Sequence, residues 1–166
     1  MTEATVTTGG VLAGRAICER LHHHGHDVLT THLLADDVDD AESQLTEGQV
    51  FRRDIEWMSE CAVLVAEASG SSYGVGFEMG YVLGRARTSG QRVVLVDDAS
   101  RRPSISRLIP GNCDAACTRF AYTSLEELRA FVDRHFLGKG PPGRSRATDH
   151  RLMVGGRTHA RPVLPR

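Results

Sequence analysis

The sequence predicts an α/β fold in which a doubly wound, parallel, five-stranded sheet carries helices on both faces. Over residues 1–137, segments with the helical period alternate with short segments that are β-branched or continuously apolar. The apolar runs within residues 62–66 and 92–97 are typical of parallel strands that are covered on both sides. A chain of 166 residues that is 40% hydrophobic can form one such domain without a disulfide or a metal to stabilise it.

The first third of the chain supplies two strands and a helix. Residues 5–8 are β-branched, which predicts a short first strand. Apolar residues recur at helical spacing over residues 11–21, and Gly25 is placed to end that helix. Residues 27–34 are predicted to form the second strand. The acidic residues 35–48 have little apolar content, so we expect a loop or a mobile lid there.

The middle of the chain continues the alternation. A helical stripe of apolar residues over residues 49–59 precedes the buried strand at residues 62–66. A Gly/Ser-rich segment at residues 69–76 is predicted to be a loop, and it leads into a helix at residues 77–87. These elements form one strand–helix unit of the sheet.

The last elements complete a Rossmann-like order. The strand at residues 92–97 is followed by a polar loop that contains Pro103 and Pro110. A final strand is predicted at residues 118–121. The sequence Thr-Ser-Leu-Glu-Glu, which begins at Thr123, offers a capping box for a last helix that ends at Phe136.

Charge divides the chain into two parts. Residues 138–166 hold seven basic residues and one acidic residue, whereas residues 1–137 hold 13 basic and 20 acidic ones. The basic part is rich in Gly, Pro, Arg and Ser, and it has too little apolar periodicity to offset the entropy of ordering it. We therefore expect a folded domain over residues 1–137 and a mostly disordered basic tail over residues 138–166. The tail has no aromatic residue for base stacking, so nucleic acid is not an expected partner.

Several classes of protein are excluded by what the sequence lacks. No apolar run approaches the roughly 18 residues that a membrane span requires, and the first ten residues have no secretory-signal pattern. We expect a cytoplasmic protein without membrane contact. The histidines of residues 22–26 lie at the end of a predicted helix, and Cys113 and Cys117 have no third ligand nearby, so we expect no metal and no cofactor.

Ligands of open parallel sheets bind beyond the carboxyl ends of the strands, where helix N-termini offer free N–H groups. Three places in the sequence meet this condition, namely Gly9 with Gly10, His32, and the segment at residues 69–76. In the last of these, Ser72 supplies a hydroxyl, while Gly74 and Gly76 would let the backbone approach a phosphate closely. An ordinary Gly/Ser-rich loop before a helix explains the same pattern and is the simpler interpretation.

Two carboxylates are candidates for chemistry beside this segment. Glu78 is predicted in the first turn of the following helix, next to Phe77 and Met79, although the helix dipole alone also favours an acid there. Asp54 lies in the preceding helix, where a solvated role is equally ordinary. Two carboxylates that flank one crevice would suit cleavage of a glycosidic bond, one as nucleophile and the other as acid.

The order and spacing of four motifs resemble a known family. They are Leu-Thr-Thr-His at residues 29–32, Asp-Ile-Glu-Trp at residues 54–57, the apolar strand at residues 62–66 that leads to Glu67, and Ser-Ser-Tyr-Gly-Val-Gly-Phe-Glu-Met-Gly at residues 71–80. Together they resemble the nucleoside 2-deoxyribosyltransferase superfamily, and within it most closely the 2'-deoxynucleoside 5'-phosphate N-hydrolases. The resemblance extends over residues 25–137. It includes the loop at residues 106–111.

This resemblance implies a role for each candidate residue. Glu78 would attack C1' of the sugar and form a glycosyl-enzyme intermediate, and Asp54 would contact the sugar and help the base to leave. Ser72, Gly74 and Gly76 would form the loop that binds the 5'-phosphate, and Ser106 would reach the phosphate of the neighbouring subunit in a homodimer. The implied substrate is a small (deoxy)nucleotide or nucleoside.

The first residues depart from the family pattern. Family members begin with an apolar strand that carries an aromatic residue, followed by a Gly-Ser-Ile-Arg-Gly-Gly-like turn, of which residues 4–10 keep only Gly9 and Gly10. Three functions therefore stay open. The protein hydrolyses (deoxy)nucleoside 5'-monophosphates, or it exchanges bases between deoxynucleosides, or it binds nucleotides without catalysis.

Overall fold

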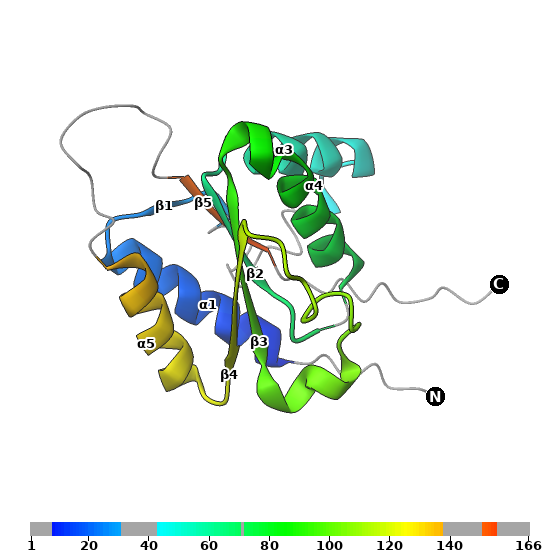
Figure 1. The fold of residues 1–166 in the computed structure, drawn as a ribbon. Helices are drawn as coiled ribbons and strands as arrows, with labels where there is room; N and C mark the ends of the chain where they lie inside the picture. Colours follow the sequence, from blue (N-terminus) through cyan, green and yellow to red (C-terminus); the bar gives the residue numbers. More distant parts are fainter. Residues whose placement is uncertain (1–7, 31–42, 71, 138–150, 156–166) are drawn as a thin grey trace.

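The computed structural model describes residues 8–30, 43–70, 72–137 and 151–155, and these form one parallel sheet between two helical layers. The sheet order is β1-β5-β2-β3-β4 (Figure 1). The strands are β1 (Asp27–Val28), β2 (Val63–Glu67), β3 (Arg92–Asp98), β4 (Cys117–Tyr122) and β5 (Arg151–Gly155), and every neighbouring pair is parallel. The predicted doubly wound α/β fold with five parallel strands is confirmed.

Each face of the sheet has its own apolar core. On one face, α1 (Thr8–His23) and α5 (Leu125–Phe136) cover Val65 and Val96 (Figure 1). On the other face, α3 (Glu47–Glu60) and α4 (Tyr73–Ser89) cover Leu64 and Leu95. Successive residues of a strand point to opposite faces, and all five residues of β2 are buried, as the continuous apolar run predicts.

Local signals explain where the helices begin and end. Thr46 caps α3 in a reciprocal capping box with Gln49, and Ser124 caps α5 by accepting a hydrogen bond from the Glu127 amide. The helix α1 is followed by Gly25 at φ 77°, in the left-handed region that glycine adopts without strain. The predicted end of the first helix and the predicted capping of the last helix are thereby confirmed.

The predictions for the first two strands hold only in part. Residues 5–7 lie outside the described residues, and Thr8, expected in a strand, is already in α1. The second strand is only Asp27–Val28 rather than residues 27–34, of which residues 31–34 lie outside the described part. Leu29 nevertheless continues the pairing, because its amide donates to the Leu152 carbonyl at 2.9 Å.

The fifth strand, β5, lies within residues 138–166, which the sequence predicts to be a mostly disordered tail. Residues 151–155 pair with β1 on one side and β2 on the other, with Leu152 opposite both Val28 and Val63. Leu152 and Met153 are 2% and 1% exposed, one in each apolar core. Three consecutive apolar residues are enough for a strand here because both faces and both edges are covered. The rest of the predicted tail lies outside the described residues.

A buried hydroxyl extends this pairing beyond β1. Thr30 is fully buried, and its Oγ1 donates to the Val154 carbonyl at 3.0 Å and accepts from the Val154 amide at 3.0 Å. The side chain therefore satisfies both backbone groups of Val154, as a strand neighbour would. Within the described part of the chain, no helix is long and apolar enough to cross a membrane.

Candidate functional site

The loop from β2 to α4 occupies the edge of the sheet where ligands of this fold class bind. The helix α4 begins at Tyr73, not at residue 77, so Gly74 and Gly76 lie in its first turn rather than in a loop. Ser72 is the N-cap, and its Oγ accepts a hydrogen bond from the Val75 amide at 3.4 Å. The burial of Val75 and Met79 against the sheet explains why a Gly/Ser-rich segment becomes helical.

The first turn of α4 has open space beside it. A Cβ atom built on Gly76 would meet no atom within 4 Å, and one on Gly74 would meet only Ser72 Oγ, at 3.5 Å. The unbonded amides at a helix N-terminus carry partial positive charge, which favours an anion. Ser72, Gly74 and Gly76 are therefore brought together where a phosphate would fit.

Glu78 lies in the second turn of α4, so the prediction that placed it in the first turn is wrong. Its Oε2 atom is buried and has no hydrogen-bond partner. Burial raises the pKa of Glu78 to about 7, and the negative charge of Asp54 adds to this shift. A helix-dipole role does not account for such a residue, because a capping acid is solvated and its pKa is lowered rather than raised.

Asp54 reaches Glu78 from the neighbouring helix α3. Its Oδ1 atom accepts from Arg53 Nε and pairs with Arg53 Nη2, each at 2.9 Å. The Arg53 guanidinium in turn lies 4.6 Å from the centre of the Trp57 ring. In the Asp-Ile-Glu-Trp motif, the Asp54 carboxylate is therefore paired with a cation that also contacts Trp57. The sequence motif identified Asp54 but gave no signal for the role of Arg53.

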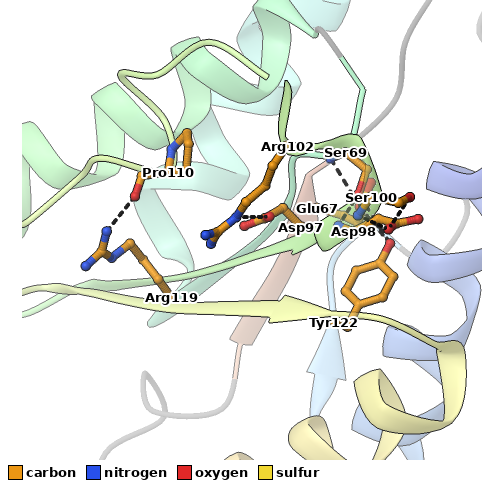
Figure 2. A network of polar contacts seen from close by, with 9 residues as sticks. All are labelled: Glu67, Ser69, Asp97, Asp98, Ser100, Arg102, Pro110, Arg119 and Tyr122. Atoms are coloured by element: carbon orange, nitrogen blue, oxygen red, sulfur yellow. Dashed lines mark hydrogen bonds and ion pairs between the residues drawn. The ribbon is translucent and has the colours of Figure 1, made fainter. Parts of the chain in front are cut away.

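A second buried glutamate, Glu67, ends strand β2 and is 2% exposed. Its Oε1 atom accepts hydrogen bonds from the Ser69 amide at 3.2 Å, from Ser69 Oγ, and from the Tyr122 hydroxyl at 3.0 Å (Figure 2). Ser69 Oγ also accepts from the Asp98 amide at 2.7 Å. Burial raises the pKa of Glu67, and the hydrogen bonds from Ser69 and Tyr122 oppose that rise. Sequence reasoning missed this network, although an acid that ends a buried strand could have suggested it.

The loop after η2 (Ala99–Ser104) is held in place by two arginines. Arg102 Nε donates to the buried Asp97 at 2.9 Å, and Arg119 donates to the Pro110 carbonyl (Figure 2). Between these contacts lies Ser106, which is exposed and whose carbonyl accepts from the Ile109 amide at 2.9 Å. The two arginine contacts therefore hold the loop in place, while Ser106 is exposed to solvent.

The remaining sequence candidates are placed differently. Gly9 and Gly10 are in the first turn of α1, not in a loop after a strand. His32 lies outside the described residues. Cys18 and Cys61 are buried, as expected of small core residues, and in the described part of the chain all four cysteines are free. Of the histidine run, His24 pairs with Asp133 at 2.8 Å across α1 and α5.

Comparison with known proteins gives consistent matches. A sequence model of the family described as nucleoside 2-deoxyribosyltransferase matches residues 11–124. A protein of Thermofilum pendens, provisionally named 2'-deoxynucleoside 5'-phosphate N-hydrolase 1, is 39% identical over 113 residues, which cover 68% of this chain and 76% of that protein. The 5-hydroxymethyl-dUMP N-hydrolase of Homo sapiens is 32% identical over 136 residues, covering 80% and 74%. That of Esox lucius is 28% identical over 131 residues, covering 77% and 87%. The family match includes Asp54, Ser72, Glu78 and Ser106 and ends before β5.

Proposed function

The chain belongs to the nucleoside 2-deoxyribosyltransferase family, and on this premise we propose that it hydrolyses the N-glycosidic bond of (deoxy)nucleoside 5'-monophosphates. The products are the free base and a sugar 5-phosphate. Support for hydrolysis comes from the relatives that are named as N-hydrolases. Support for the site comes from one observation, the buried Glu78 carboxyl whose Oε2 atom has no partner and whose pKa is raised by burial and by Asp54.

Glu78 is the nucleophile in this proposal. A buried carboxylate without a hydrogen bond is costly in the free protein, and that cost falls when the group bonds to an electron-poor carbon. The C1' atom becomes oxocarbenium-like as the base departs, so it is the matching partner for Glu78. The raised pKa also makes the ionised form of Glu78 a stronger nucleophile than an exposed glutamate.

The pair Glu78 and Asp54 carries one proton below pH 7, and this proton serves the leaving base. Arg53 pairs with Asp54 at 2.9 Å, and burial raises the pKa of Glu78 to about 7, so below that pH the shared proton rests on Glu78. The proton moves from Glu78 to Asp54, Glu78 attacks C1', and Asp54 then protonates the departing base. Water gives one proton to Asp54 while its oxygen attacks C1', which releases Glu78. The final transfer of that proton back to Glu78 restores the starting state.

The phosphate is bound by dipoles rather than by bulk charge. Residues 1–137 carry more acidic than basic groups, and the segment from Ser72 to Gly76 contains neither lysine nor arginine. The Ser72 hydroxyl and the amides of Tyr73 and Gly74 at the start of α4 supply the donors that a phosphate needs. No cofactor or metal enters the proposed reaction.

The site is completed in a homodimer, in which Ser106 of one subunit reaches the phosphate bound by the other. Ser106 is exposed on an anchored loop, and Phe51 and Phe77 are 57% and 51% exposed beside the site. Mixing Glu78→Gln protein with Ser106→Ala protein tests this arrangement, because the mixed dimer then contains one site with both residues intact. Activity that stays at the sum of the two separate variants contradicts a role for Ser106 across the interface.

The primary test is release of free base from a panel of 2'-deoxynucleoside 5'-monophosphates, followed by chromatography. Glu78→Gln should abolish release, while Glu56→Gln, an exposed acid on α3, should leave it unchanged. Adding a second free base distinguishes transfer, which yields a new nucleoside, from hydrolysis. Tight binding of a deoxynucleotide without release of base would instead identify a binding protein.

A further inference from the structure

Hydrogen bonds of Glu67 and Ser69 connect the carboxyl ends of three neighbouring strands. Glu67 ends β2, Asp98 ends β3 and Tyr122 ends β4. Ser69 stands between them, because its Oγ donates to Glu67 and accepts from the Asp98 amide at 2.7 Å. Figure 2 shows these side chains converging at the end of the sheet. The network is 2% exposed at Glu67 and 6% at Ser69, so each of its hydrogen bonds is shielded from water.

Ser69 is connected through a short segment to the phosphate end of the proposed site, which consists of Ser72, Gly74 and Gly76. Ser69 is followed by Gly70, whose carbonyl accepts from the Ser72 amide at 3.0 Å, and Ser72 is the N-cap of α4. Only two residues separate Ser69 from Ser72 in the chain, and the Gly70–Ser72 hydrogen bond fixes Ser72 relative to Gly70. The position of the Ser72 hydroxyl therefore depends on where Ser69 is held.

Glu78 does not depend on Ser69 in the same way. It lies in the second turn of α4, next to Met79, and the helix is held against the sheet by Val75, Met79 and Val82, each no more than 3% exposed. A shift at Ser69 would thus displace the N-cap and the first amides of α4 more than the carboxylate of Glu78. The two ends of the site are fixed by different contacts, one polar and one apolar.

We propose that Glu67, acting through Ser69, is a positioning residue for the phosphate end of the substrate site. This proposal rests on the proposed function for its substrate, a deoxynucleoside 5'-phosphate. The buried carboxylate accepts two hydrogen bonds from Ser69, and it thereby holds the turn from which Ser72 is presented. Glu67 touches neither the sugar nor the base in this arrangement, and it is not part of the proton transfers between Glu78 and Asp54.

The test compares each substrate with and without its 5'-phosphate. Ser69→Ala removes the link between Glu67 and the Asp98 amide. We expect it to raise KM for the deoxynucleotide by about 10-fold or more, as expected for the loss of a hydrogen bond to a charged group. The kcat for the deoxynucleotide and the kcat/KM for the unphosphorylated deoxynucleoside should change less than about twofold. Ser69→Thr keeps the hydroxyl and should restore KM. Ser89→Ala, at the far end of α4, is the matched control.

Two results would overturn the proposal. Equal losses for the phosphorylated and unphosphorylated substrates would show a general structural role, and an unchanged KM in Ser69→Ala would show that the network does not set the phosphate end. Calorimetric binding of a deoxynucleoside 5'-phosphate and of its nucleoside keeps the inference separate from the reaction. If the wild-type protein releases no base, the proposed function fails, but Ser69→Ala should still weaken nucleotide binding alone. Wild-type protein that does not bind the nucleotide more tightly than the nucleoside contradicts the inference.

Discussion

Glu67 and Glu78 lie at the end of a strand and in the helix that follows it, and their surroundings are opposite. Glu67 accepts three hydrogen bonds on one oxygen, two from Ser69 and one from Tyr122. Glu78 is half-buried, yet its Oε2 atom is buried without a partner and the charge of Asp54 acts against its ionisation. An unpaired carboxylate oxygen is costly where it is shielded from water, as Glu78 Oε2 is.

The difference indicates what each glutamate is for. A buried acid that is fully engaged by the protein contributes to local order, and it has little capacity left for a ligand. A buried acid that lacks a partner is at higher free energy until a ligand supplies one, and perturbed groups of this kind cluster at functional sites. The following experiments test this contrast, beginning with the largest expected effect.

Replacing Glu78 should have the largest effect on activity. Glu78→Gln removes the proposed nucleophile while keeping the size of the side chain, so we expect base release from a deoxynucleoside 5'-monophosphate to fall on the order of 1,000-fold or more. Chromatographic assays of released base measure the change. The exposed control Glu56→Gln should retain wild-type rates. Undiminished release in Glu78→Gln would remove the basis for contrasting the two glutamates.

Replacing Asp54 should reverse the dependence of activity on pH. In the wild-type protein, kcat/KM should fall as the pH rises through about 7, because the pair then loses the proton that the leaving base needs. Asp54→Asn removes the negative charge that raises the pKa of Glu78, so Glu78 ionises at lower pH but no acid remains. We expect a loss on the order of 100-fold at pH 6 and a rate that rises with pH. The measurement is kcat/KM from pH 5 to pH 9.

A substrate that needs no acid provides the control for Asp54. An N7-methylated purine deoxynucleotide already carries a positive charge, so its base leaves as a neutral molecule without protonation. In a single turnover, Asp54→Asn should therefore release this base nearly as fast as the wild-type protein does. Should the variant keep the wild-type decline above pH 7, or lose as much activity on the methylated substrate, the shared proton is not part of the reaction.

The sequence predicted the elements that have clear apolar periodicity or a recognisable motif. The apolar run of β2 and the alternation of helices and strands sufficed for the fold class, and the motifs at Asp54 and Glu78 sufficed to nominate both carboxylates. The start of α4 was missed because Gly and Ser favour a loop, whereas the burial of Val75 and Met79 stabilises a helix there. At that position, tertiary packing outweighs the intrinsic preference of Gly and Ser for a loop.

Two features depended on contacts that no local pattern contains. The strand β5 has only three apolar residues, and they lie inside a basic segment. Its stability comes from β1 and Thr30, which are more than a hundred residues away in the chain, and from β2, which is more than eighty residues away. The network of Glu67 likewise required Tyr122, which is brought to it by the order of the strands. Residues that are distant in sequence determine both, so periodicity and spacing could not reveal them.

The stability of the protein should respond to Glu78 in a direction opposite to that of an ordinary buried-residue substitution. The pKa of Glu78 is about 7 in the folded protein and 4.5 without the fold, so its contribution to stability is full below about pH 4.5 and is lost as the pH rises through about 7. Glutamine does not ionise. Glu78→Gln should therefore be more stable than the wild-type protein by about 3 kcal/mol at pH 8, and the two should converge at pH 4. Urea denaturation at both pH values measures the difference, and destabilisation at pH 8 would contradict it.

Removing one donor from Glu67 should produce the smallest effect, and one of opposite sign. Tyr122→Phe keeps the ring, which is 4% exposed in the core with α1 and α5, but deletes the hydroxyl that donates to Glu67 at 3.0 Å. The free energy of unfolding should fall by about 1 kcal/mol, while kcat stays within about twofold because Glu78 and Asp54 are untouched. Tyr81→Phe is the matched control, since its hydroxyl accepts from Arg85 on the partly exposed side of α4 and is compensated by water. A gain in stability in Tyr122→Phe would mean that Glu67 is not satisfied by the fold, and the contrast with Glu78 would then disappear.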